Sequence, residues 1–310
     1  MIWPFRKPAS EPAAAAKLDA AAIVRQARRL QFRVRPVAVA ELAGAYLGAR
    51  PGTGLTFVEL KAYEPGDDVR YLDWNVTARQ GKPYVRRFVE ERSLVLWLIV
   101  DVSASMRFGP EGRTKADRAA QAAALLAAAA VRNGDRAGLA LVSDRVEVEL
   151  APGGGARHLA RLLRALVATP ATSRRSAPSM GLSRLRRSSR RALVVVLSDF
   201  LTPEPAGLWR RAARRHEVVA IRVVDPREET LPAAGLIALE DAEQGTRRML
   251  DSGSKRVRQT YARLARERKA AHLSWCADVG LSGFEIATEV DPIRPLLNFF
   301  RGRVARRGLR

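Results

Sequence analysis

Apolar runs alternate with helical segments over most of the chain. The two most hydrophobic runs, Leu94–Val100 and Ala192–Leu197, are continuous, which is typical of strands covered on both faces. Further strands are predicted at Ala137–Val142, Arg145–Leu150, Glu217–Val223 and Phe284–Thr288. Helices are predicted from their apolar spacing at Thr114–Arg132, Ala156–Ala168, Pro178–Arg190, Pro205–His216, Ser254–Val279 and Pro292–Arg303. This alternation predicts an α/β fold with a doubly wound, mostly parallel, Rossmann-like sheet.

The pattern before residue 92 differs and predicts an N-terminal extension. Residues 1–17, with prolines, alanines and few large apolar groups, are predicted to be a flexible tail. Residues 18–91 form the extension, which is rich in turns and ends in a strand at Tyr84–Val89. We expect it to pack on the α/β domain with Trp74 as an anchor. That domain is assigned to residues 92–300, including a hairpin at 236–250, and residues 301–310 to a basic tail.

Composition narrows the choice of partners and compartment. The 310 residues include 54 Lys and Arg against 32 Asp and Glu, a formal charge of +22, which favours acidic partners. The single cysteine, Cys276, excludes an intramolecular disulfide and a cysteine-based zinc site. No apolar run reaches the roughly 20 residues that a membrane helix needs. We therefore expect a cytoplasmic protein.

Polar oxygen-bearing side chains follow two of the most hydrophobic strands. Asp101 comes directly after the first, with Ser103 and Ser105 at alternate positions, and Asp199 follows the second. If both strands are central and parallel, both carboxylates emerge at the same edge of the sheet. Such an all-oxygen set suits a hard cation, Mg²⁺ or else Mn²⁺ or Ca²⁺. The alternative is an ordinary strand end with a helix cap, because Asp and Ser are favoured in both places.

The same residues carry a family resemblance. DVSASM at 101–106 resembles the metal-ion-dependent adhesion site (MIDAS) of von Willebrand factor A-type domains. The segment from KAYEPGDDVRYLDW to VRRFVEER, the motifs NGDRAGLALVSD and VVVLSDF, and the ending DPIRPLLNFF resemble the bacterial domain-of-unknown-function 58 family. The resemblance implies a von Willebrand factor A-like domain with Asp101, Ser103 and Ser105 in the first metal loop and Asp199 in the third.

The second metal loop departs from the family pattern. The expected Thr falls near Ser176, and Thr172 or Ser173 would take its place if the loop is shifted. In integrin-like sites a carboxylate of the partner completes the coordination, so the resemblance implies cation-dependent adhesion to a protein. Members of the family are typically encoded beside MoxR-type AAA+ ATPases. We therefore expect a non-enzymatic adaptor that works with such an ATPase in the assembly or remodelling of protein complexes.

Two other classes of function stay open. The basic segments 183–191 and 255–269 would serve a binder of nucleic acid or of an anionic surface, although Tyr261 is their only aromatic residue. A metal-dependent phosphoester hydrolase would use the same cation to activate water. The upstream signature, which includes Gly66, Asp67, Asp68 and Arg70, is expected to be structural or to form a partner surface, because it contains no nucleophile–base pair.

Overall fold

The computed structural model describes residues 42, 55–64, 67, 69, 72–90, 94–110, 112–168, 173–187 and 191–307. Its centre is a six-stranded sheet with the order β10-β7-β6-β3-β4-β5. The strands are β3 (Val95–Asp101), β4 (Arg136–Val142), β5 (Val146–Gly153), β6 (Leu193–Ser198), β7 (Glu217–Val224) and β10 (Ser282–Ala287). All are parallel except the edge strand β5, which is antiparallel to β4. The predicted α/β fold with a mostly parallel sheet is confirmed.

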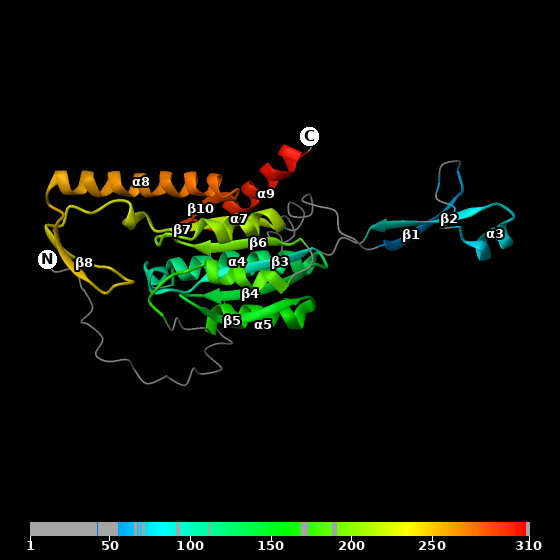
Figure 1. Ribbon diagram of the computed structural model, residues 1–310, viewed down its shortest axis with the longest axis horizontal. Helices are drawn as coiled ribbons and strands as arrows, with labels where there is room; N and C mark the ends of the chain where they lie inside the picture. Colours follow the sequence, from blue (N-terminus) through cyan, green and yellow to red (C-terminus); the bar gives the residue numbers. More distant parts are fainter. Residues whose placement is uncertain are drawn as a thin grey trace.

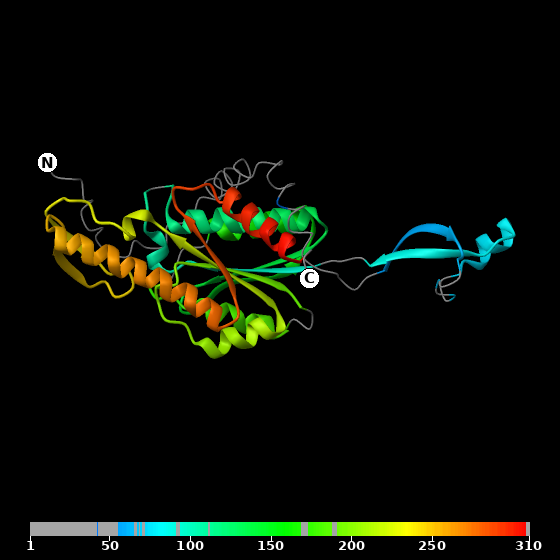
Figure 2. The same ribbon diagram turned by 90° about the horizontal axis from the view of Figure 1, so that it is seen from above.

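Helices cover both faces of this sheet (Figures 1 and 2). One face carries α4 (Lys115–Arg132), α5 (Gly155–Ala168) and α9 (Ile293–Arg307), and the other carries α6 (Ser179–Leu182), α7 (Ala206–Arg215) and α8 (Lys255–Asp278). The alternation of side chains along β3 divides the core. Leu96, Leu98 and Val100 belong to the first layer, while Trp97 and Ile99 belong to the second. Burial on both faces explains why the strand is apolar throughout.

The direction of the strand order reverses beside β3. After β3 the chain adds β4 and β5 on one side, then returns to place β6, β7 and β10 on the other. In open α/β sheets ligands bind at such a switch point, outside the carboxyl ends of the strands. In Figure 1 this edge faces the hairpin of β8 (Leu236–Glu240) and β9 (Arg247–Asp251). Asp101 and Asp199 both stand here.

One helix prediction is wrong. Instead of a continuous helix over Pro178–Arg190, α6 ends at Leu182 and a 3₁₀ helix, η3, follows at Ser183–Arg187. The hydroxyl of Ser183 donates to the carbonyl oxygen of Met180 at 2.6 Å, and such a local bond competes with helix propagation. At the C-terminus, the segment from residue 301, predicted to be a basic tail, continues α9 as far as Arg307.

Leu42 of the N-terminal extension is buried in the core of the α/β domain, whereas the strands and helix described over residues 55–90 form a small separate unit. β1 (Leu55–Ala62) pairs with β2 (Tyr84–Glu90), which confirms the strand predicted there, and α3 (Trp74–Gln80) lies between them in the chain. In both views the unit stands beyond the amino end of β3, away from the sheet (Figures 1 and 2). Trp74, the first residue of α3, is 71% exposed, so its expected role as an anchor on the sheet is wrong.

Asp67 has the structural role expected for the upstream signature. Its carboxylate accepts a hydrogen bond from the Glu64 N–H at 3.0 Å and lies 3.2 Å from the ammonium of Lys61. Gly66, Asp68 and Arg70, together with the predicted tail at 1–17, lie outside the described residues. Among the helices that are described, none has the length and apolarity to cross a membrane.

Asp135, just before β4, makes the stability dependent on pH. Its Oδ1 accepts a hydrogen bond from the Leu94 N–H at 2.7 Å, and its buried Oδ2 has no partner among the described residues. Burial raises the pKa of this carboxyl to about 6, so the folded chain holds a proton that the unfolded chain releases near pH 4. Stability contributed by this group is therefore present below pH 4 and is lost as the pH rises to 6.

The corresponding variant is Asp135→Asn, which is isosteric and does not ionise. We expect it to be more stable than the wild type at pH 8 by about 1–3 kcal/mol, and to keep only about a third of this advantage at pH 4.5. Urea denaturation of both proteins at the two pH values measures the difference. An advantage of equal size at both pH values would show that ionisation of Asp135 is not its source.

Candidate functional site

Asp101 is the centre of the polar cluster at the switch point. It is fully buried and accepts three hydrogen bonds. Its Oδ1 accepts from the Ser103 N–H at 2.9 Å, and its Oδ2 accepts from the hydroxyls of Ser176 at 2.6 Å and Ser198 at 2.7 Å. These donors come from the turn after β3, the loop before α6 and the end of β6. One carboxylate therefore joins three segments that are distant in the sequence.

The two serines after Asp101 do not act as helix caps. They lie on a turn around the 3₁₀ helix η2 (Ala104–Arg107), and Ser103, at its N-cap position, makes no side-chain cap hydrogen bond. Instead, the hydroxyl oxygens of Ser103 and Ser105 lie 3.2 Å apart and both residues are buried. This arrangement disfavours the capping interpretation, because the two hydroxyls pair with each other.

Ser176 supplies the hydroxyl of the second loop. The sequence placed the expected Thr near this position, and the bond from Ser176 to Asp101 brings it into the cluster. The loop is also tied to the first one, because the Ala104 N–H donates to the carbonyl oxygen of Arg174 at 3.3 Å. Ser173 instead accepts a local hydrogen bond from the Arg175 N–H. Thr172, the alternative candidate, lies outside the described residues.

Asp199, after β6, is held by a buried lysine. The ammonium of Lys115, the first residue of α4, lies 2.7 Å from Asp199 Oδ2 and 2.7 Å from Glu228 Oε1. Asp199 Oδ1 accepts from the Leu201 N–H at 3.3 Å. Burial by itself lowers the pKa of Lys115, but the charges of Asp199 and Glu228 outweigh it and raise the pKa above its usual value. Lys115 is therefore a buried ammonium ion within the cluster.

Sequence reasoning missed three members of the cluster: Lys115, Ser198 and Glu228. For Lys115 the sequence offers one usable signal. A cation in the first turn of a helix is repelled by the positive end of the helix macrodipole, so a negatively charged partner is expected nearby. Ser198 lies beside Asp199 in the motif VVVLSDF, in which the family resemblance points to Asp199 alone. Glu228, in the 3₁₀ helix η4 (Pro226–Glu228), gave no signal in the sequence.

The donor set fits a hard divalent cation. Burial, followed by the negative charge of Asp199, raises the pKa of Asp101 despite its three hydrogen bonds, so a positive charge nearby would favour its ionised form. The predicted donors are two carboxylates and three hydroxyls, without sulfur or imidazole, and Mg²⁺ and Ca²⁺ prefer such oxygen ligands. These donors are Asp101, Asp199, Ser103, Ser105 and Ser176. Within the described chain no three Asp, Glu, His or Cys side chains form a metal-binding group. A cation here would therefore depend on the serine hydroxyls.

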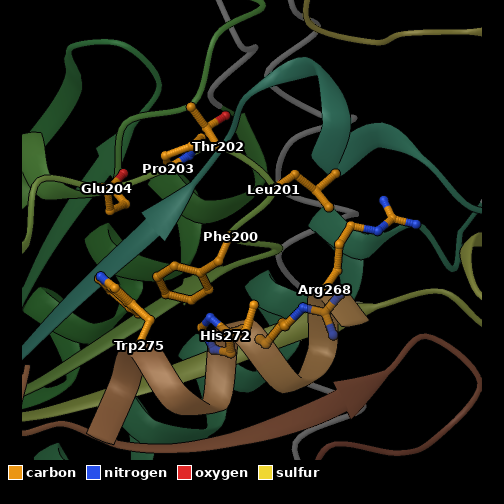
Figure 3. Close-up of a pocket in the computed structure, with 10 residues that line it drawn as sticks. Phe200, Leu201, Thr202, Pro203, Glu204, Arg268, His272 and Trp275 are labelled. Carbon is orange, nitrogen blue, oxygen red and sulfur yellow. The ribbon is translucent and has the colours of Figure 1, made fainter. Parts of the chain in front are cut away.

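A pocket is lined in part by Phe200 and Leu201, the residues that directly follow Asp199 (Figure 3). It has a volume of about 300 Å³ and lies between the segment after β6 and helix α8. Phe200 adopts a left-handed backbone conformation, φ 50°, and its ring lies 4.7 Å from that of His272. Burial lowers the pKa of His272 to about 4, so the ring is neutral at physiological pH. Arg222 links pocket and cluster, because its Nε donates to the carbonyl oxygen of Asp199 at 3.3 Å.

The fold and cluster define an α/β protein with an oxygen-rich site at the switch point of its sheet. Residues 59–271 match the family described as "Protein of unknown function DUF58", and the chain belongs to that family. Uncharacterized proteins of Mycobacterium bovis and Mycobacterium tuberculosis are each 35% identical to it over 288 residues, covering 91% of this chain and 89% of each relative.

Two solved structures are similar to parts of the chain. The conserved hypothetical protein BatB from Bacteroides thetaiotaomicron has a TM-score of 0.46 and 13% identity, covering 69% of this chain and 100% of that one. Proximal thread matrix protein 1 from the mussel byssus, solved with a zinc-occupied MIDAS motif, has a TM-score of 0.34 and 15% identity, covering 42% of this chain and 38% of that one.

Proposed function

We propose that this chain is a non-enzymatic adaptor that recognises a partner protein through a divalent cation, Mg²⁺ or else Mn²⁺ or Ca²⁺. The observation that carries the proposal is the convergence of oxygen-bearing side chains from three segments at the switch point. Asp101, Ser103, Ser105, Ser176 and Asp199 would hold the cation directly or through water, with Thr172 as the alternative ligand of the second loop. The arrangement resembles a metal-ion-dependent adhesion site.

The bound cation would supply an open coordination position for a carboxylate of the partner. The surroundings support a protein partner, because large apolar side chains are exposed on two of the site-forming loops. Phe108, after the first loop, is 42% exposed, and Leu201, after the third, is 38% exposed. Aromatic residues such as Phe108 are enriched in protein–protein interfaces relative to the rest of a protein surface.

A MoxR-type AAA+ ATPase is the partner that the family resemblance suggests. A two-partner adaptor needs a second surface, and the unit of β1, β2 and α3 would supply it, since it stands beyond the opposite edge of the sheet (Figure 1). Its Trp74 is 71% exposed. We propose that one partner binds at the cation edge while the other binds this unit. Complex assembly or remodelling would follow from bringing the two together.

The first test is calorimetric titration with Mg²⁺ and Mn²⁺. We expect saturable binding to the wild type and its loss in Asp101→Asn, because the substitution removes the central charge of the donor set. Asp144→Asn is the matched control, since Asp144 follows β4 at the same edge of the sheet but is 41% exposed and pairs with Arg145. We expect this control to bind as the wild type does. Equal binding by Asp101→Asn would place the cation elsewhere.

Capture experiments separate the adaptor from the two other classes of function. Capture of the candidate ATPase or its client should require the divalent cation and fail in EDTA and in Asp101→Asn. Affinity for nucleic acid that is unchanged by EDTA and falls steeply with rising salt concentration would favour a nucleic-acid binder that uses the basic segments 183–191 and 255–269. Phosphoester turnover lost in Asp101→Asn would favour the hydrolase.

A further inference from the structure

We infer that Lys115 limits the affinity of this site for divalent cations by competing for Asp199. The inference rests on the proposed cation site and adds a residue that controls it. The key observation is that the ammonium of Lys115 already occupies a position 2.7 Å from Asp199 Oδ2, with no exposure to solvent. A cation bound by Asp199 must share this carboxylate with a positive charge or displace it.

Lys115 is held firmly in this position by the backbone around it. It follows Thr114, the N-cap of α4, which forms a reciprocal capping box with Asp117. The Lys115 N–H donates to the carbonyl oxygen of Phe108 at 2.9 Å, which fixes the helix start to the first loop of the site. The start of α4 is therefore part of the site rather than a neighbouring surface.

Glu228 gives the ammonium a second partner. Its Oε1 lies 2.7 Å from Lys115 Nζ, and its side chain is 23% exposed. If Asp199 turned to a cation, Lys115 would keep one ion pair and would not become an unpaired buried charge, which is very costly. The two acids thus make an exchange of partners feasible, in which Lys115 moves toward Glu228 as Asp199 engages the cation.

The exchange has a cost in cation affinity. Lys115 forms ion pairs with two carboxylates, those of Asp199 and Glu228. While this arrangement holds, one oxygen of Asp199 is already paired with a positive charge. Two positive groups beside one carboxylate repel each other strongly in a buried site. We expect this repulsion to weaken cation binding at least about tenfold relative to a site with Asp199 released.

The test is Mn²⁺ titration of four proteins: wild type, Glu228→Gln, Lys115→Met, and the double variant Lys115→Met/Glu228→Gln. The double variant is the decisive one, because it removes one positive and one negative charge and keeps the net charge of the wild type. We expect it to bind Mn²⁺ at least about tenfold more tightly than the wild type, and to lose this gain when Asp199→Asn is added. Glu228→Gln alone should not bind more tightly than the wild type.

The outcomes distinguish this inference from the proposed function. Affinity of the double variant within threefold of the wild type, with both lost in Asp101→Asn, would overturn the role of Lys115 and leave the cation site in place. Binding by the double variant but not by the wild type would support Lys115 and overturn cation dependence in the native chain. No binding by any of the four would overturn both.

A second measurement uses the wild type and does not depend on the folding of the variants. The ¹⁵N and ¹H signals of the buried Lys115 ammonium group can be followed by NMR while Mg²⁺ is added. We expect them to shift with saturation as the ammonium exchanges Asp199 for Glu228. Unchanged signals at a Mg²⁺ concentration that calorimetry shows to be saturating would contradict the exchange.

Discussion

Replacing Gly109 with alanine is expected to lower the free energy of unfolding by about 2–4 kcal/mol. Gly109 lies between the first loop of the site and α4, with φ 138°, a conformation that L side chains rarely adopt. A Cβ added here would lie 2.5 Å from the Cα of Thr114 and 2.8 Å from the carbonyl oxygen of Arg113. Because both contacts are with backbone atoms, the start of α4 would have to move, and Lys115 with it.

Gly112→Ala is the matched control for this prediction. Gly112 lies in the same loop with φ 75°, but no atom lies within 4 Å of an added Cβ. We expect only the left-handed backbone cost, about 1 kcal/mol. Urea denaturation of the two variants measures the contrast. Equal effects would show that the close approach to Thr114 can relax and does not hold the helix start in place.

Replacing Trp209 with alanine is expected to cost about 3–5 kcal/mol, as for other large buried aromatic residues. The indole is fully buried in the layer beneath α7, and its Nε1–H donates to Glu204 at 3.0 Å. Its ring centroid lies 5.9 Å from that of Phe200 and 5.2 Å from that of Trp275. The loss would leave a cavity and remove one of the two hydrogen-bond donors to the partly buried Glu204 carboxylate, the other being the Ser179 N–H at 3.3 Å.

The same substitution should also affect the site, because Phe200 follows Asp199 directly. We expect Mn²⁺ affinity to fall together with stability when the support of Phe200 is removed. Trp74→Ala is the control, since it removes the same side chain from an exposed position and should change stability by less than about 0.5 kcal/mol. A Trp209→Ala variant with wild-type stability would mean that the layer repacks around the cavity.

The strands and the two aspartates could be predicted because each depends on a local pattern. Leu94–Val100 is apolar at every position since both faces of β3 are buried, and the same holds for β6. The prediction that Asp101 and Asp199 share one edge needed only that the two strands be parallel and central. β3 and β6 are in fact direct neighbours, which brings the two carboxylates to the same switch point.

The helix at 178–190 and the role of Trp74 could not be predicted in the same way. A Cβ on Gly181 would lie 2.5 Å from the Cγ2 of Ile99, so the close approach of α6 to β3 depends on a contact across 82 positions of the chain. The sequence predicts Trp74 to be an anchor on the α/β domain, but the side chain is exposed. Its exposure follows from the attachment of its unit beyond the amino end of β3, which hydrophobicity does not encode.

Sequence by itself determined the class of fold, the strands that form its centre, and a row of oxygen-bearing side chains after β3. These follow from periodicities of two and 3.6 residues and from side chains adjacent in the chain. Only the tertiary structure decided what surrounds Asp101 and Asp199. Ser176 and Ser198 reach Asp101 across 75 and 97 positions, and Lys115 reaches Asp199 across 84 and Glu228 across 113. A buried charge pairs with groups that lie close to it in space. Spacing along the chain does not determine which groups those are, because they come together only when the sheet forms.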